Sequence, residues 1–223
     1  MKASTKLLLL FVVLGFSFAR AEAESPKPSS SPAPVRVACV GDSITVGVGA
    51  ELGKSYPSQL QALLGNGWQV KNFGSSGRTL LRNGDHPYWK ERVFHDAQEF
   101  RPDVVVIMLG TNDTKPQNWQ FHEQFHDDYR DLVKTFRALP SKPRIYVCRP
   151  CPVPEPGNYG INEANVQREI AIIDALAREE GLEVIDMHAA LEPHPELLPD
   201  RVHPNTAGAT LMAQTVAKAI SGK

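Results

Sequence analysis

One run of apolar residues constrains the fold of this chain more than any other feature. Six apolar residues follow one another from Val104 to Leu109, and Gly110 ends the run. A strand that is apolar on both faces is typical of the centre of a parallel sheet, because helices cover both sides of such a sheet. Shorter runs of mainly apolar residues predict four more strands, over residues 35–40, 68–73, 144–147 and 182–185.

Segments with helical periodicity separate these runs. Apolar residues recur at intervals of three and four between Phe121 and Phe136, which predicts an amphipathic helix. Further helices are predicted over residues 56–64, 164–180 and 205–220. Strands that alternate with helices indicate the α/β class with a parallel five-stranded sheet, and 223 residues suffice for a single domain.

The amino-terminal segment is expected to lie outside this domain. Residues 1–23 combine two lysines, an apolar stretch and two small-x-small cleavage sites that end at Ala21 and Ala23. They predict a secretory signal peptide, since a membrane span needs about 20 apolar residues. Residues 24–34 are rich in proline and serine and predict an extended spacer, which leaves 35–223 as the folded domain. We therefore expect a secreted or periplasmic protein with no membrane attachment once the signal is removed.

Charge and cysteine content limit the possible partners and chemistry. The net charge of -1 argues against nucleic-acid binding, which needs a basic surface. With three cysteines, Cys39, Cys148 and Cys151, at least one thiol stays free. Cys148 and Cys151 have redox-motif spacing but follow a predicted strand instead of a helix start that would stabilise a thiolate. Buried thiols or an incidental bridge are therefore expected, and the sequence indicates neither their redox state nor the oligomeric state.

Three polar or glycine residues follow predicted strands. Ser43, Gly74 and Asn112 each come within three residues of a strand end. Because ligands bind at the carboxyl ends of parallel strands, all three can reach one crevice. Taken singly, each block is also compatible with an ordinary turn. The Gly-x-Ser-x-Gly elbow of α/β-hydrolases is not indicated, because Thr45 occupies its last position.

A serine nucleophile needs a neighbouring base and donors for the developing oxyanion. His203 is the candidate base, and Asp200, three residues earlier, can orient its ring and leave Nε2 free for Ser43. The alternative is a capping aspartate beside a bystander histidine. The backbone N–H groups of Ser43 and Gly74 and the side-chain amide of Asn112 are the candidate oxyanion donors.

These blocks resemble those of a known enzyme family. Residues 41–44, 72–74, 110–113 and 200–204 are similar in identity and order to the four blocks of the SGNH (GDSL-type) hydrolases. The resemblance implies a flavodoxin-like three-layer α/β/α fold with no metal or organic cofactor. It also implies an acyl-serine intermediate, Ser43, Asp200 and His203 as catalytic residues, and an oxyanion hole at Ser43, Gly74 and Asn112.

A finer resemblance involves residues 72–79, 86–89 and 110–119. These segments are similar to secreted bacterial acetylesterases of sugars, including sialate O-acetylesterase-like proteins. Side chains in these segments that could contact substrate are Arg78, Tyr88, Trp89 and Trp119. Loop packing is the alternative role for the three aromatic residues.

Two further motifs resemble those of zinc-binding and phosphate-binding sites. His122 and His126 form the His-Glu-x-x-His pattern of zinc proteases, but the segment after them lacks the glycine and histidine of the extended form. Residues 49–55 resemble a phosphate-binding loop with three residues between the glycines instead of four. The first motif lacks its extended form and the second has the wrong glycine spacing, so we expect no metal and no nucleotide.

The sequence therefore predicts an exported serine esterase that removes small acyl groups, above all acetyl, from carbohydrates. Its partner would be a small-molecule or polysaccharide acyl ester. One alternative is a lysophospholipase or arylesterase, which acts on lipid or aryl esters. The other is a catalytically silent carbohydrate-binding module. The sugar and the position of its ester remain open.

Overall fold

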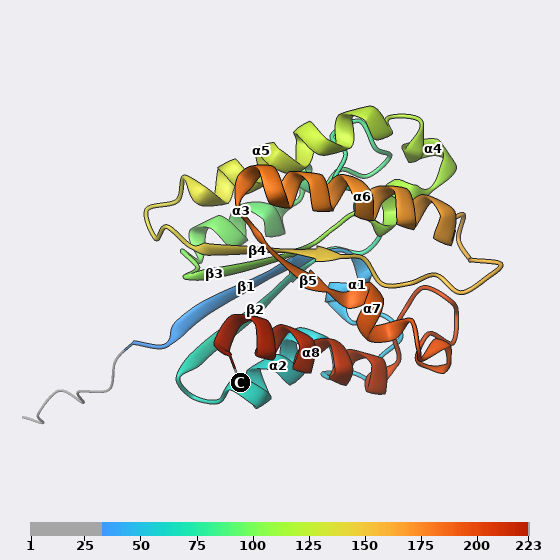
Figure 1. Cartoon of the computed structure of the whole chain (residues 1–223). Helices are drawn as coiled ribbons and strands as arrows, with labels where there is room; N and C mark the ends of the chain where they lie inside the picture. Colours follow the sequence, from blue (N-terminus) through green and yellow to red (C-terminus); the bar gives the residue numbers. More distant parts are fainter. Residues whose placement is uncertain (1–32, 223) are drawn as a thin grey trace, which may run out of the picture. The chain divides into compact units, whose positions relative to one another are not determined.

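The computed structural model describes residues 33–222, and a parallel five-stranded sheet forms its centre (Figure 1). The strands are β1 Val35–Gly41, β2 Trp68–Gly74, β3 Val104–Met108, β4 Arg144–Arg149 and β5 Glu183–Asp186. Their order in the sheet is β2-β1-β3-β4-β5, and all neighbours are parallel. The predicted α/β class and parallel sheet are confirmed. The predicted signal peptide, and all but the last two residues of the spacer, lie outside the described residues.

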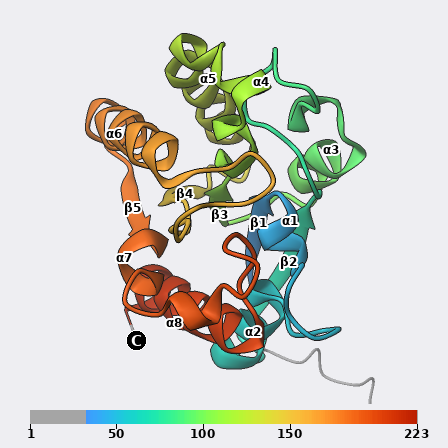
Figure 2. The same cartoon turned by 90° about the vertical axis from the view of Figure 1, so that its right-hand side faces the viewer.

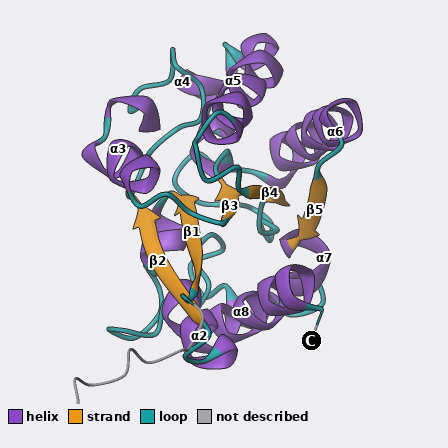
Figure 3. Ribbon diagram, turned by 90° about the vertical axis from the view of Figure 1, so that its left-hand side faces the viewer, coloured by secondary structure: helices purple, strands orange, loops and turns teal. Residues whose placement is uncertain are grey.

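Helices cover both faces of the sheet (Figures 1 and 3). The longer ones are α2 Tyr56–Leu64, α3 Arg92–Glu99, α5 Phe125–Arg137, α6 Glu163–Glu180 and α8 Thr206–Ser221. The short ones are α1 Ser43–Val46, α4 Pro116–Trp119 and α7 Met187–Leu191, with 3₁₀ turns at Tyr88–Lys90, Thr111–Thr114, His122–Gln124 and Pro195–Leu197. Helices α2, α7 and α8 pack on one face, and α3, α5 and α6 pack on the other. Among the described residues, no helix is both long and apolar enough to cross a bilayer.

The apolar run at β3 belongs to two separate cores. Val104, Val106 and Met108 pack with α2, α7 and α8, whereas Val105 and Ile107 pack with α3, α5 and α6. Side chains alternate between the faces of a strand, so a strand covered by helices on both sides needs apolar residues at every position. This is the physical reason for the six-residue run.

One predicted helix begins later than expected. Helix α5 begins at Phe125, and the residues before it form α4 and a 3₁₀ turn. The amides of Phe121 and Gln124 donate to the carbonyls of Asn118 and Phe121, which closes two tight turns. The apolar periodicity from Phe121 onward therefore extends through a segment that is not α-helical.

The chain order across the sheet creates a crevice beside β1. The connection from β1 leads to β2 on one side, and the chain returns to β3 on the other side of β1. Such a reversal leaves an opening at the carboxyl ends of the two strands, where α/β proteins bind ligands. Figure 2 looks at this end of the sheet, where α1 and the loops before α6 and α8 gather.

Candidate active site

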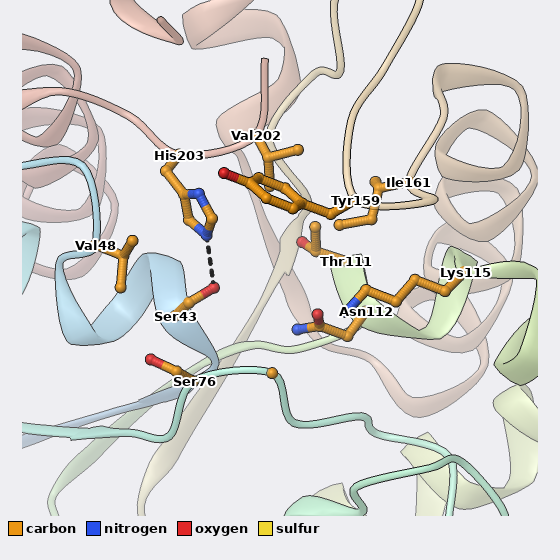
Figure 4. A pocket seen from close by; sticks show the side chains of 11 residues that line it. Ser43, Val48, Ser76, Thr111, Asn112, Lys115, Tyr159, Ile161, Val202 and His203 are labelled. Carbon is orange, nitrogen blue, oxygen red and sulfur yellow. Dashed lines mark hydrogen bonds between the residues drawn. The ribbon is translucent and has the colours of Figure 1, made fainter. Parts of the chain in front are cut away.

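A pocket opens at the carboxyl ends of β1 and β3 (Figure 4). Its volume is about 330 Å³, at the small end of the range for ligand sites. The lining residues are Ser43, Val48, Ser76, Gly77, Thr111, Asn112, Lys115, Tyr159, Ile161, Val202 and His203. Five segments of the chain, after β1, after β2, after β3, between β4 and α6, and before α8, therefore meet at one cavity.

Ser43, His203 and Asp200 form a continuous hydrogen-bonded chain. Ser43 Oγ lies 2.9 Å from His203 Nε2, and His203 Nδ1 lies 2.7 Å from Asp200 Oδ2 (Figure 4 draws the first bond). A carboxylate only accepts hydrogen bonds, so His203 carries its proton on Nδ1 when neutral. Nε2 is then an acceptor for the Ser43 hydroxyl. The predicted pairing of these three residues is present in the structure.

The backbone of the Asp200 turn holds its carboxylate ionised. Asp200 Oδ1 accepts hydrogen bonds from the amides of His203 at 2.7 Å and Val202 at 3.0 Å. Burial works against the charged form, but the bonds from His203 and Val202 outweigh it and hold the pKa of the Asp200 carboxyl below its usual value. Asp200 can therefore keep a negative charge beside the histidine ring.

Glycines and caps fix the elements that carry these side chains. Asp42 caps α1 by accepting from the Ile44 amide at 2.9 Å, and this places Ser43 at the first turn after β1. A Cβ on Gly49 would lie 3.0 Å from His203 Cβ, and the φ of Gly49 is +92°. The loop that resembles a phosphate-binding motif thus packs against the histidine.

Asn112 is held with its amide toward Ser43. Its Nδ2 donates to Asp42 Oδ2 and to the Arg78 carbonyl, both at 3.1 Å, and Figure 4 shows the amide nitrogen on the Ser43 side. Burial raises the pKa of the Asp42 carboxyl to about 6, although the bond from Ile44 and nearby positive charges oppose this. Both N–H groups of the Asn112 amide are therefore engaged within the protein, and one of them would have to turn to, or be shared with, a substrate oxygen.

Gly74 differs from its prediction. It is the last residue of β2, does not line the pocket, and donates its N–H to Asn72 Oδ1 at 2.9 Å. A Cβ here would lie 2.6 Å from the Val46 amide, so the glycine permits α1 to pack closely on β2. The prediction of Gly74 as an oxyanion donor is wrong in this structure. Gly77, with a φ of +79°, lines the pocket instead.

The predicted aromatic contacts are also absent from the pocket lining. Tyr88 is completely buried and donates its hydroxyl to the Phe73 carbonyl at 2.6 Å. Trp89 donates its Nε1 to the Leu80 carbonyl at 2.7 Å, and Trp119 is buried and stacks on His122. The prediction that these three residues contact substrate is therefore corrected. Their side chains pack within the protein, where they bond to backbone carbonyls or stack on a neighbouring ring.

Arg78 is turned toward the protein as well. Its guanidinium pairs with Glu91 at 2.8 Å and donates to the Ser76 carbonyl, and its side chain does not line the pocket. The prediction of a substrate contact is therefore corrected too. What Arg78 supplies is its backbone carbonyl, which accepts from Asn112.

The remaining motifs are accounted for by packing. His122 Nδ1 donates to the Trp119 carbonyl, whereas His126 Nε2 lies 3.0 Å from Glu179. Within residues 33–222, no group of three or more His, Cys, Asp or Glu side chains is arranged to hold a metal ion. The three cysteines are free and buried, and burial raises the pKa of each thiol, that of Cys39 to about 12.

Two buried carboxyl groups that the sequence analysis did not single out lie behind the site. Asp113 Oδ1 and Oδ2 accept from the Leu81 and Leu80 amides, yet burial raises the pKa of Asp113 to about 8. Glu169 on α6 is completely buried, packs against Gly110, and has no hydrogen-bond partner within the described residues. Burial, together with Asp113 and Asp42, raises the pKa of Glu169 well above its usual value. These acids stay protonated over part of the neutral range.

The buried acids make stability depend on pH. Asp113 and Glu169 hold protons in the folded protein that the unfolded chain releases above about pH 4, so their contribution to the free energy of unfolding falls as the pH rises toward about 8. Glu169→Gln should leave the melting temperature nearly unchanged at pH 4.5 and raise it at pH 8, because the glutamine removes a carboxyl group that burial keeps from ionising freely. Glu99→Gln, which removes an exposed carboxylate from α3, is the control. Equal melting temperatures for wild type and Glu169→Gln at both pH values would mean that Glu169 is ionised in the fold.

Comparisons with known proteins agree with this geometry. The family described as GDSL-like Lipase/Acylhydrolase matches residues 39–211. An acetylxylan esterase from Xylanibacter ruminicola is 42% identical over 207 residues. That match covers 83% of this chain, and the chain spans only 43% of the length of the relative.

Solved structures share the fold at lower identity. A carbohydrate acetylesterase from Sinorhizobium meliloti has a TM-score of 0.70 at 21% identity, over 84% of this chain and 99% of the other. An acetyl xylan esterase named AlAXEase has a TM-score of 0.66 at 22% identity, over 83% of this chain and all of the other. At these identities the likeness establishes the three-layer arrangement around the parallel sheet.

Proposed function

Because the chain belongs to the GDSL-like lipase/acylhydrolase family, we propose that it is a serine esterase that removes small acyl groups, above all acetyl, from carbohydrates. The observation that carries the proposal is the chain of contacts from Ser43 Oγ through His203 to Asp200. The 42% identical relative, an acetylxylan esterase, supports a carbohydrate ester as substrate. The small pocket volume of about 330 Å³ favours a short acyl group.

The first half of the reaction forms an acyl-serine. Ser43 Oγ attacks the ester carbonyl carbon while its proton moves to His203 Nε2. Asp200 stabilises the imidazolium that results. Collapse of the tetrahedral intermediate breaks the bond to the sugar oxygen, which takes the proton from His203 and leaves as an alcohol.

The second half releases the acid. Water loses a proton to His203 Nε2 as it attacks the acyl carbon, and the new intermediate expels Ser43 Oγ, which recovers the proton. Three donors would stabilise the oxyanion in both halves: the backbone N–H groups of Ser43 and Gly77 and the amide of Asn112. No step needs a metal or organic cofactor.

Export is part of the proposal. The charged start, apolar stretch and cleavage sites of residues 1–23 support a signal peptide. Export can be tested by sequencing the amino terminus of the protein recovered from the culture medium or periplasm and comparing it with the coded sequence. A terminus after Ala21 or Ala23 supports export, and an intact Met1 contradicts it.

The proposed activity can be separated from its alternatives with purified protein. We expect release of acetate from acetylated xylan. We also expect the rate of hydrolysis of p-nitrophenyl esters to fall steeply as the acyl group lengthens from acetyl to octanoyl. A preference for octanoyl would favour a lipid esterase. Binding of xylan without any acetate release would favour a silent carbohydrate-binding module.

Asn112→Ala should lower kcat about 10²- to 10³-fold with little change in KM. The amide nitrogen lies toward Ser43. One of its N–H groups, which bond to Asp42 and the Arg78 carbonyl in the free enzyme, would bond to the substrate oxygen more strongly as charge develops there. Steady-state kinetics on p-nitrophenyl acetate measure both constants. A rise in KM at unchanged kcat would instead place Asn112 in ground-state substrate binding.

A further inference from the structure

The pocket contains an aromatic side chain that the sequence analysis did not identify. Tyr159 lies in the loop between β4 and α6, lines the pocket and is 57% exposed. The other aromatic residues considered as substrate contacts are buried or packed against loops. An exposed ring in a pocket carries a large apolar surface that no protein group covers, and this surface is available to a ligand.

The backbone holds Tyr159 in an unfavourable conformation. Its φ is +52°, in the left-handed region that bulky residues rarely adopt, and Gly157 and Gly160 on either side have φ values of +79° and +80°. The Tyr159 amide donates to Asn158 Oδ1 at 2.8 Å, and Asn158 Nδ2 donates to the Asp200 carbonyl at 2.9 Å. The loop is thus tied to the turn that carries the catalytic acid. Strained residues of this kind are concentrated at functional sites.

The Tyr159 side chain also contacts the catalytic residues directly. Its hydroxyl donates to Asp200 Oδ2 at 3.3 Å, the same oxygen that accepts from His203 Nδ1. Its ring lies 5.7 Å from the His203 ring, centroid to centroid, at an angle of 58° (Figure 4). The polar end of Tyr159 is therefore used within the protein, and its ring borders the cavity.

We propose that Tyr159 positions the carbohydrate part of the ester with its ring and positions Asp200 with its hydroxyl. A pyranose ring has apolar C–H faces and polar edges, which an aromatic face beside polar groups fits well. Ser76, Thr111 and Lys115 line the same pocket and can bond the hydroxyl edges. The proposal rests on the carbohydrate esterase function proposed above and names the residue that selects a sugar ester over a simple one.

Two substitutions separate the two roles. Tyr159→Ala removes both the ring and the hydroxyl and, like tyrosine, carries a Cβ at positive φ, so the backbone penalty stays similar. Tyr159→Phe removes the hydroxyl alone. Leu63→Ala is the control, because Leu63 on α2 is 49% exposed and lies outside the pocket lining. Xylose tetraacetate and ethyl acetate are the substrates, since ethyl acetate has no ring to pack on Tyr159.

We expect Tyr159→Ala to raise KM for xylose tetraacetate about tenfold and to leave KM for ethyl acetate within about twofold. Tyr159→Phe should keep the wild-type KM for both substrates and lower kcat about threefold for both. It should also move the acidic limb of the kcat profile to higher pH. Without the bond from Tyr159, Asp200 Oδ2 accepts from His203 alone, and its negative charge stabilises the protonated ring more strongly. A purely structural residue would not change the pH profile while leaving KM intact.

The results that overturn the inference differ from those that overturn the proposed function. An equal change in KM for both substrates in Tyr159→Ala, or an unchanged KM for xylose tetraacetate, would refute the positioning of the sugar while the esterase function stands. An unchanged kcat and pH profile in Tyr159→Phe would refute the contact with Asp200. Failure of the wild-type protein to hydrolyse either ester would refute the proposed function and the inference together.

Discussion

Replacement of Ser43 by alanine should lower ester hydrolysis about 10⁶-fold, to the limit of detection in ordinary assays. Ser43 Oγ is the atom proposed to form the acyl bond, and without it the base at His203 has no proton to accept from the enzyme. Ser43 lies at the start of α1, and its side chain makes its one hydrogen bond among the described residues with His203. The fold should therefore be preserved, with a melting temperature within a few degrees of wild type.

The matched control is Ser221→Ala at the end of α8. This hydroxyl bonds to the Ala217 carbonyl on the far side of the sheet from α6, away from the pocket lining. Hydrolysis of p-nitrophenyl acetate should be lost in Ser43→Ala and kept in Ser221→Ala. Retention of more than a trace of activity by Ser43→Ala would mean that another group attacks the ester.

His203→Ala should cause the second largest loss, about 10⁵-fold in kcat, because Ser43 then has no base. Asp200→Asn should cause a smaller loss, up to about 10⁴-fold. The asparagine oxygen can keep the bonds from the Val202 and His203 amides, which turns its NH₂ group toward His203 Nδ1. That contact favours the tautomer with the proton on Nε2, which cannot accept the Ser43 proton.

The pH profile of the wild type tests the same assignment. A protonated His203 ring cannot act as a base, so activity should be lost toward acidic pH and level off at higher pH. The lowered pKa of Asp200 keeps that carboxylate ionised into the weakly acidic range. An unaltered acidic limb in His203→Ala, together with most of the wild-type activity, would force withdrawal of the assignment.

The architecture could be predicted because buried positions carry apolar residues, and their spacing in the sequence differs between strands and helices. The run from Val104 to Leu109 indicates a central strand because both faces of β3 are covered. The Asp200 and His203 pair was also predictable, since three residues in one turn bring the two side chains together. Glu169 could have been found as well: Val166 and Ile173, one turn away on either side, are buried, so Glu169 falls on the apolar face of α6.

Other features depend on where strands end in three dimensions. Gly74 and Gly77 lie in one short segment separated by two serines, and either could donate to an oxyanion. The choice follows from the pairing of Gly74 with Gly41 as the last residues of β2 and β1, which leaves Gly77 in the following turn. Pairing of this kind is a tertiary property, so the local sequence could not decide between the two glycines.

Aromatic roles could not be assigned from the sequence for a similar reason. Tyr88 and Tyr159 both follow loop-forming residues, but one ring is completely buried and the other is 57% exposed. Exposure depends on which helices cover each loop. The two glycines around Tyr159 are the single local signal, because they permit the turn that presents the ring to the pocket.

Reaction of the intact protein with a fluorophosphonate, followed by peptide mass spectrometry, tests most directly whether Ser43 is the nucleophile of this site. The reagent forms a stable bond with a serine that a neighbouring base activates. We expect one adduct per chain, on Ser43, which is absent from Ser43→Ala and strongly reduced in His203→Ala. An adduct on any other residue, or unchanged labelling of Ser43→Ala, would contradict this assignment.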